Sequence, residues 1–103
     1  MSTYQIIFWR DIPAQVKVRS GSQRINRQLS DRFQEAIDAA AMRASTTSTE
    51  DYLEEWRTSD WQNEAGEAEQ LADAVASRLE QSYPPDRLKA LVVNNGYEPA
   101  VSE

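Results

Sequence analysis

The chain contains no cysteine and no histidine among its 103 residues. Without cysteine there are no disulfides, thiolate nucleophiles, cysteine zinc sites or iron–sulfur clusters. Without histidine the usual general base near neutral pH and the commonest metal ligand are missing. A catalytic site would have to use carboxylates, lysine, tyrosine or hydroxyl groups, and a metal site would be limited to oxygen ligands. These absences do not forbid an enzyme, but nothing in the sequence supports one, and we expect a protein that is not an enzyme and carries no cofactor and no metal.

Long apolar runs and glycine-rich motifs are missing too. No apolar stretch approaches the ~20 residues of a membrane span, and the first residues do not resemble a signal peptide. The mean hydropathy is -0.71 and 27% of the residues are charged. The three glycines, Gly21, Gly66 and Gly96, form no phosphate-binding motif. We therefore expect a cytoplasmic protein that does not associate with membranes.

The charge is negative overall but unevenly placed. The formal net charge of -6 argues against nucleic-acid binding, which depends on neutralising phosphates. Six of the eleven basic residues, but only two acidic ones, lie within the first 32 positions. The favoured interpretation is a basic first part packed beside acidic helices. The alternative is a patch that faces an anion, either a phosphate or carboxylate ligand or an acidic partner.

Two segments near the N-terminus predict a β-hairpin. Residues Tyr4–Trp9 are rich in β-branched and aromatic side chains, and both of their faces are largely apolar. Residues Ala14–Arg19 alternate, so that alanine and valine face inward while Gln15, Lys17 and Arg19 face outward. Pro13 fits the connecting turn or the start of the second strand. Since a two-stranded hairpin is marginal alone, helices must cover it.

The rest of the chain predicts helices. Apolar residues recur at helical spacing from Ile25 to Ala41, which predicts one long helix capped by Ser22. A short helix follows, capped by Ser48, and then a loop at Thr58–Asn63 that carries Trp61.

Two further helices are expected toward the C-terminus. The first covers Glu64–Gln81, and the second covers Asp86–Asn94, with Asn95-Gly96 as its stop. The alternative for the last segment is a third strand through Leu91–Val93. The fold class is therefore α+β: one domain over residues 1–96, with an N-terminal β-hairpin packed by three to four α-helices, and a flexible tail over residues 97–103.

Aromatic residues with neighbouring arginines are the leading candidates for a partner-binding site. Trp9-Arg10 and Trp56-Arg57 repeat the same pair, and Trp61 lies nearby in the sequence. Tryptophan is enriched among interface anchors. The alternative is that Trp9 packs with Trp56 in the core. If the first interpretation holds, Trp9→Ala weakens partner binding while the domain stays folded.

A second candidate site uses the basic segment Arg19–Arg32. Arg19, Arg24 and Arg27 lie close to the turn at Ser20-Gly21-Ser22, whose backbone N–H groups can face an anion. The alternative is an ordinary turn followed by a helix cap. This segment would hold a small anionic ligand such as a phosphate or a polycarboxylate.

Four stretches of the sequence resemble a known family. They are YQIIFWRDIPAQV at 4–16, LSDRFQEAIDAAAM at 29–42, YLEEW at 52–56 and RLKAL at 87–91. Together they resemble the small bacterial proteins of the virulence factor family, a domain also found in conserved virulence factor C of staphylococci. The resemblance runs from Tyr4 to about Gly96. It implies an accessory subunit, because members are often encoded near folate- and corrinoid-dependent methyl-transfer proteins, and it carries over no catalytic or ligand residue.

The sequence thus predicts a non-catalytic cytoplasmic protein-interaction domain. We expect a small accessory subunit or adaptor of a bacterial metabolic complex, with folate or corrinoid methyl transfer as the process that the resemblance implies. The other hypothesis is a small domain that binds an anionic ligand on the basic segment.

Overall fold

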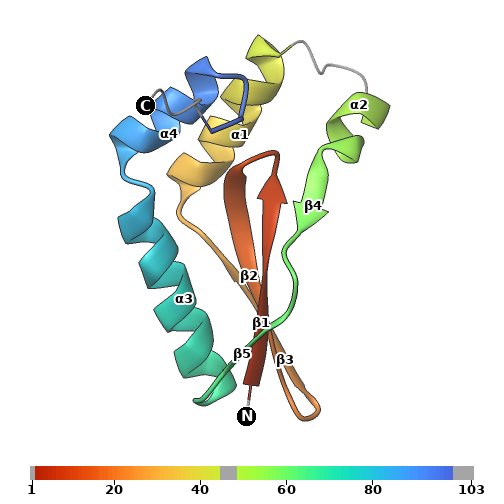
Figure 1. Ribbon diagram of the computed structural model, residues 1–103, viewed down its shortest axis with the longest axis vertical. Helices are drawn as coiled ribbons and strands as arrows, with labels where there is room; N and C mark the ends of the chain where they lie inside the picture. Colours follow the sequence, from red (N-terminus) through yellow and green to blue (C-terminus); the bar gives the residue numbers. More distant parts are fainter. Residues whose placement is uncertain (1, 45–48, 99–103) are drawn as a thin grey trace, which may run out of the picture.

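The computed structural model describes residues 2–44 and 49–98 and has an antiparallel sheet flanked by helices (Figure 1). In chain order the elements are β1 (Ser2–Trp9), β2 (Ile12–Ser20), β3 (Gln23–Gln28), α1 (Asp31–Arg43), α2 (Thr49–Glu54), β4 (Trp56–Thr58), β5 (Gln62–Glu64), α3 (Ala68–Ser82) and α4 (Pro85–Val93). The expected α+β class, with its N-terminal hairpin and covering helices, is confirmed. In the part of the chain that the structure describes, no helix is both long and apolar enough to cross a membrane.

The sheet has the strand order β3-β2-β1-β4, and β5 also pairs with β1. The predicted hairpin is present as β1 and β2, with a register irregularity between Ile7 and Phe8. The predicted alternation of β2 is also observed. Val16 and Val18 are buried against the helices, while Arg19 is exposed on the other face.

The prediction of one long helix from Ser22 is wrong in its first part, because Gln23–Gln28 form strand β3. Gly21 has φ +60 and Ser22 has no positive φ, as in a two-residue type II′ hairpin turn. This turn folds the chain back, so that every residue of β3 pairs with β2. Pairing along the whole strand outweighs a helical spacing that rests on Ile25 alone in this segment. The helix α1 begins only at Asp31.

The predicted loop at Thr58–Asn63 is also wrong in part. Its ends are the short strands β4 and β5, which pair with opposite halves of β1. Between them Ser59 holds the chain to β1, since its N–H donates to the Ile6 carbonyl at 2.9 Å and its hydroxyl accepts the Ile6 N–H at 2.9 Å. Trp61 lies in the short break between the two strands.

The remaining helices follow the predictions closely. The segment at 86–94 is helical, as α4, and not a third strand. Helix α3 begins four residues later than expected, at Ala68. Helix α2 covers most of the expected short helix, whereas its proposed cap, Ser48, lies outside the described residues.

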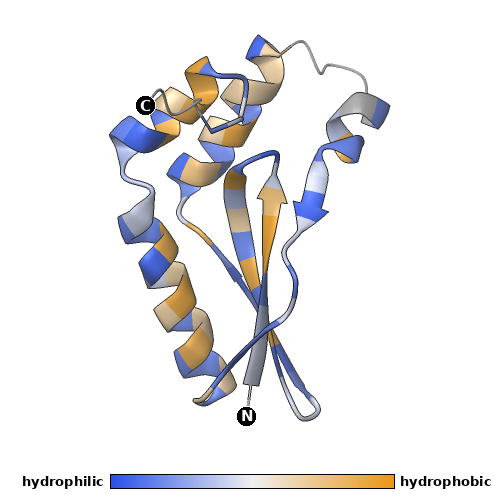
Figure 2. Ribbon diagram, in the orientation of Figure 1, coloured by the Kyte–Doolittle hydropathy of each residue, from blue (hydrophilic) through white to orange (hydrophobic). Residues whose placement is uncertain are grey.

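Two apolar clusters lie between the sheet and the helices, and they follow the hydrophobic stripes in Figure 2. One joins β1 and β2 to α1 and α4, and its largest members are Trp9, Phe33, Ile12, Ile37 and Leu91. The other joins Val16 and Val18 of β2 to α3, through Leu71, Ala72 and Val75. Where β2 pairs with β3, α3 covers the face that carries Val16, Val18 and Ile25. On the other face of these two strands, Arg19, Arg24 and Asn26 are exposed.

Trp9 belongs to the first cluster and is fully buried, with an exposed fraction of 0%. Its ring stacks on Tyr52 with centroids 5.8 Å apart, and its indole N–H donates to the Tyr52 carbonyl at 3.1 Å. It also lies opposite Trp56 in the β1–β4 register. The structure therefore matches the alternative of core packing. The surface anchor expected at Trp9 is corrected, because no part of the side chain reaches solvent.

We expect Trp9→Ala to lower the free energy of unfolding by about 3–5 kcal/mol, since it empties the largest buried position of the core. That loss is a large share of the about 5–15 kcal/mol available to a typical domain. Urea denaturation followed by circular dichroism measures it. A loss below about 1 kcal/mol, the size expected for a surface side chain such as Trp61, would contradict the burial.

Candidate functional site: the basic face of the sheet

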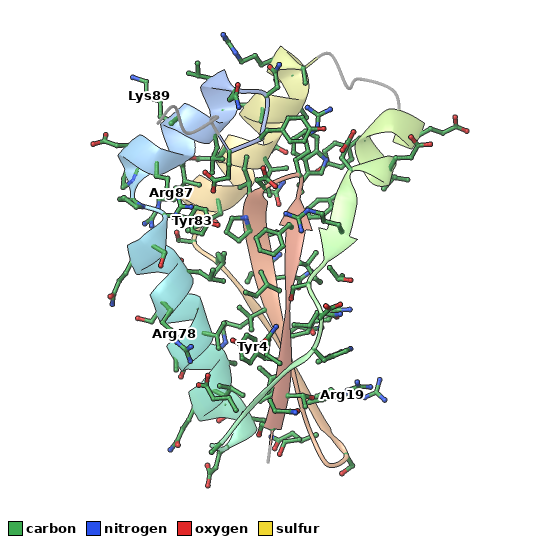
Figure 3. All side chains as sticks on the ribbon, in the orientation of Figure 1. Tyr4, Arg19, Arg78, Tyr83, Arg87 and Lys89 are labelled. Carbon is green, nitrogen blue, oxygen red and sulfur yellow. The ribbon has the colours of Figure 1, made fainter. Side chains whose placement is uncertain are left out.

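Strands β2 and β3 bring several cations together on the face of these strands that α3 does not cover. Arg19 lies directly opposite Arg24, and Lys17 lies opposite Asn26. Figure 3 shows Arg19 extending away from α3, whereas Tyr4 points toward that helix. We call the surface formed by Lys17, Arg19, Arg24, Asn26 and Trp61 the basic face. These five residues, with Val18, line an open cleft of about 200 Å³.

Trp61 is the aromatic member of the basic face. Its side chain comes from the break between β4 and β5, on the far side of β1 from β3. The residue is 39% exposed, and the Arg19 guanidinium lies over its ring, 4.1 Å from the centroid. An aromatic ring beside a stacked guanidinium gives a flat contact surface that keeps its positive charge.

The cations of the basic face have no ion-pair partner among residues 2–44 and 49–98, unlike most arginines of the protein. Six arginines form ion pairs with carboxylates: Arg10, Arg27, Arg32, Arg57, Arg78 and Arg87. In the same part of the chain, no carboxylate lies within ion-pair distance of Lys17, Arg19 or Arg24. Like charges directly opposite each other on two strands are destabilising. The free protein therefore keeps an uncompensated positive charge at Arg19 and Arg24.

The anion-binding set expected from the sequence is split by the structure. Arg19 and Arg24 lie together on the basic face. Arg27 belongs to the other face, where it forms an ion pair of 2.6 Å with Asp73 of α3. Lys17 and Asn26 join the site instead. The outward position of Lys17 follows from the alternation of β2. The position of Asn26 depends on β3, which the sequence does not predict because the spacing of its apolar residues indicates a helix.

Arg10, expected as a partner-binding residue, lies inside the fold. Its side chain is 10% exposed, and its guanidinium lies over the rings of Trp9 and Tyr97, 5.0 Å and 4.7 Å from their centroids. It donates to the Asn95 carbonyl at 2.7 Å and forms an ion pair of 3.3 Å with Glu55. The side chain thus ties β1 to the segments after α2 and α4.

Trp56 and Arg57 extend this arrangement along β4. Trp56 is half-buried, and its ring meets Tyr52 edge to face with centroids 5.9 Å apart. Arg57 lies 4.6 Å from the Phe8 ring centroid and donates to Asp11 at 3.0 Å. These contacts hold both side chains to neighbouring elements, although the Arg57 side chain stays 52% exposed. Trp61 is the one member of the expected partner-binding set that lies on the basic face.

The segment after α4 is held at Asp11, the carboxylate that also accepts a hydrogen bond from Arg57. The Glu98 N–H donates to Asp11 at 2.7 Å, and the Glu98 carboxylate pairs with Arg87 at 2.7 Å. Residues 99–103 of the expected tail lie outside the described residues, and its flexibility stays a prediction.

Two titratable groups with perturbed pKa values lie on the helical side of the molecule. Burial raises the pKa of the Tyr83 hydroxyl, and the nearby carboxylates of Glu98 and Asp11 add to this effect. A side-chain hydrogen bond with Glu64 raises the pKa of Arg78. In the described ranges, 2–44 and 49–98, no three acidic side chains gather into a group able to hold a metal ion.

A comparison with protein families finds one match. The family model described as "Virulence factor" matches residues 7–92, which is most of the chain and includes every residue of the basic face. No curated protein matches at a significant level, and no solved structure does so either.

The packing around Arg10 makes Gly96 a sensitive position. Its φ is +92, and a Cβ atom there would lie 2.9 Å from Trp9 Cζ3 and 3.2 Å from Arg10 Cδ. At Gly21, with φ +60, a Cβ atom would meet nothing within 4 Å. We expect Gly96→Ala to cost about 1–3 kcal/mol more stability than Gly21→Ala, because overpacking adds to the backbone strain that both share. Equal losses in thermal or urea denaturation would contradict this packing.

Proposed function

Since this chain belongs to the virulence factor family, whose matched region contains the whole basic face, we propose that it is a non-catalytic protein-interaction domain. It binds an acidic segment of a partner protein on that face, through Arg19, Arg24, Lys17 and Trp61. The prediction of an accessory subunit of a cytoplasmic metabolic complex is part of the same proposal. The partner-binding site that we propose is the basic face, in place of the site expected from the sequence at Trp9 and its neighbours.

The observation that carries the proposal is the uncompensated Arg19–Arg24 pair. Elsewhere the protein has ample carboxylates to neutralise its arginines, with 17 acidic residues against 11 basic ones. An acidic ligand would remove the repulsion between the two guanidinium groups and gain charge-assisted hydrogen bonds with both. Repulsion between Arg19 and Arg24 therefore costs the free protein some stability, and binding of an acidic ligand would remove that cost.

Trp61 supports a macromolecular partner. Tryptophan and arginine are the residue types most enriched among interface hot spots, and here they are stacked on each other at the surface. The remainder of the chain is acidic, so that long-range repulsion turns an acidic partner away from other surfaces and toward this one. The charge distribution therefore affects both the orientation in which the partner binds and the strength of binding.

The chemistry of the cleft favours binding over catalysis. The polar side chains that line it are three cations and one amide, without a carboxylate among them to serve as a general base. Its volume of about 200 Å³ is below the usual size of a pocket that encloses a small-molecule substrate. Part of a larger ligand therefore fits the cleft better than a whole substrate.

The second candidate function is binding of a small anion, and the same cleft favours it. A phosphate or carboxylate group is small enough for the cleft, and Arg19 and Arg24 are placed to hold it from two strands. This candidate differs from the first in its ligand and predicts that inorganic phosphate or pyrophosphate suffices for binding.

Charge reversal at Arg24 tests the proposal. We expect Arg24→Glu to weaken the binding of a hexaglutamate peptide by about tenfold or more at low ionic strength. Lys89→Glu is the matched control, because Lys89 is also exposed and also lacks an ion pair among the described residues, but lies on α4, away from the basic face (Figure 3). Arg24→Glu should not unfold the domain, since the introduced carboxylate would face the guanidinium of Arg19.

Binding is measured by titration with two-dimensional NMR, with the Trp61 indole N–H as the reporter on the face. Equal weakening by Arg24→Glu and Lys89→Glu would reduce the effect to net charge and contradict a specific site. Failure of the peptide to shift any resonance would also contradict the proposal. Saturable shifts with pyrophosphate, without binding of the peptide, would favour the small-anion candidate.

A further inference from the structure

We propose that the acidic segment binds by adding a strand to the free edge of β3. This inference rests on the proposed function and names how the partner is held. The partner contributes an extended stretch whose backbone pairs with β3 and whose carboxylates, on alternate residues, meet the basic face. Main-chain hydrogen bonds then supply affinity, and Arg24 and its neighbours supply the preference for acidic sequences.

The hydrogen-bond pattern shows which backbone groups of β3 point away from the sheet. The Leu29 N–H donates to the Ala14 carbonyl at 3.1 Å, and this pair continues the β2–β3 register by one step. In an antiparallel ladder, pairs that exchange hydrogen bonds alternate with pairs that do not. Ile25 and Arg27 therefore bond to β2, and the intervening residues do not. The N–H and C=O groups of Arg24, Asn26 and Gln28 face outward.

The turn before β3 gives the same assignment independently. In a two-residue hairpin the residues that flank the turn form a hydrogen-bonded pair. Here they are Ser20 and Gln23, which are paired in the register. Counting from Gln23 in steps of two again assigns Ile25 and Arg27 to the hydrogen-bonded set. The outward-facing groups of the edge are therefore fixed by two observations at opposite ends of the strand.

This edge is open. Arg24, Asn26 and Gln28 are all exposed, and within the described residues no side chain or loop donates to or accepts from their backbone groups. The opposite edge of the sheet is different, since it consists of the two short strands β4 and β5, of three residues each, which pair along β1. Strand β3 also lacks a proline, and its pairing with β2 has no bulge. Prolines and bulges are two common devices that protect an edge strand from pairing, and β3 has neither.

The side chains of β3 specify the occupant. The three residues whose backbone faces outward are also those whose side chains lie on the outer face, in line with Lys17 and Arg19 of β2. A residue of an added strand opposite Arg24 or Asn26 lies on that same face, within reach of their side chains. Glutamate or aspartate fits there. The residues between them face the opposite side, toward half-buried Ile25, and are best apolar.

Charge also decides between a partner and a second copy of this chain. Pairing β3 with β3 of another copy would bring the uncompensated Arg24 of both copies to one edge without an acidic residue between them, because QRINRQ contains none. Such pairing is opposed by repulsion. An acidic strand gains from the same charges. Charge therefore disfavours pairing between two copies of β3 and favours pairing of β3 with an acidic strand.

The probe is an octapeptide of alternating glutamate and valine, and the variants are Asn26→Pro and Asn26→Ala. Proline at 26 removes an N–H that faces outward, so the ladder with β2 is kept. Alanine at 26 controls for the lost amide side chain. We expect Asn26→Pro to weaken binding about tenfold or more and Asn26→Ala less than about threefold, with circular dichroism unchanged in both.

Amide hydrogen exchange in the unmodified protein gives a second readout that does not depend on a proline variant. Strand addition slows exchange at Arg24, Asn26 and Gln28 when the peptide is bound, and leaves Ile25 and Arg27 as they were. A peptide with the same composition in two blocks, glutamates first, should give much weaker protection.

The outcomes separate the two proposals. Protection at the three outward amides together with the loss in Asn26→Pro supports strand addition. Binding that is lost in Arg24→Glu but is unchanged in Asn26→Pro, without protection of these amides, overturns strand addition and leaves the proposed function standing. Absence of binding by both this peptide and hexaglutamate overturns both. Concentration-dependent protection without peptide would overturn the acidic partner in favour of a second copy.

Discussion

The antiparallel pairing of β2 with β3 is the interaction on which the rest of the structure depends. It gives α3 a two-stranded surface to cover, with Val16 and Val18 against Leu71 and Val75. It also places Arg24 beside Arg19 on the other side of the same strands. The two faces of one hairpin therefore have different roles, because the apolar face stabilises the domain and the charged face remains available to a ligand.

Arginine is used in two ways in this small protein. Around the β1–β2 turn, Arg10 and Arg57 lie over aromatic rings and bond to carbonyls and carboxylates, so that they join elements far apart in the sequence. On the basic face, Arg19 also lies over a ring, that of Trp61, but no carboxylate in the described residues balances it. The difference in charge compensation, more than the aromatic contact, separates the structural arginines from those proposed to bind a partner.

The sequence predicts the elements that local patterns specify and misses those that depend on distant partners. The alternation of β2 and the stripe of α3 need no other part of the chain. Strand β3 holds one β-branched residue in QRINRQ, and only β2 makes it a strand. In a helix Arg24 and Arg27 would share a face, being three residues apart. In a strand they point to opposite faces, and the expected anion site is split for this reason. Trp9 is ambiguous in the sequence, because an apolar ring suits a core and an interface equally.

Repulsion between Arg19 and Arg24 in the free protein is tested most directly by a double-mutant cycle of the stabilities of the two variants. Arg19→Gln, Arg24→Gln and the double variant are compared with the unmodified domain by urea denaturation at low ionic strength. We expect an unfavourable coupling between the two arginines of about 0.2–1 kcal/mol, which shrinks as salt is added. A favourable coupling, or one that salt leaves unchanged, would mean that the pair is part of the packing of the fold, and would contradict a face kept charged for a partner.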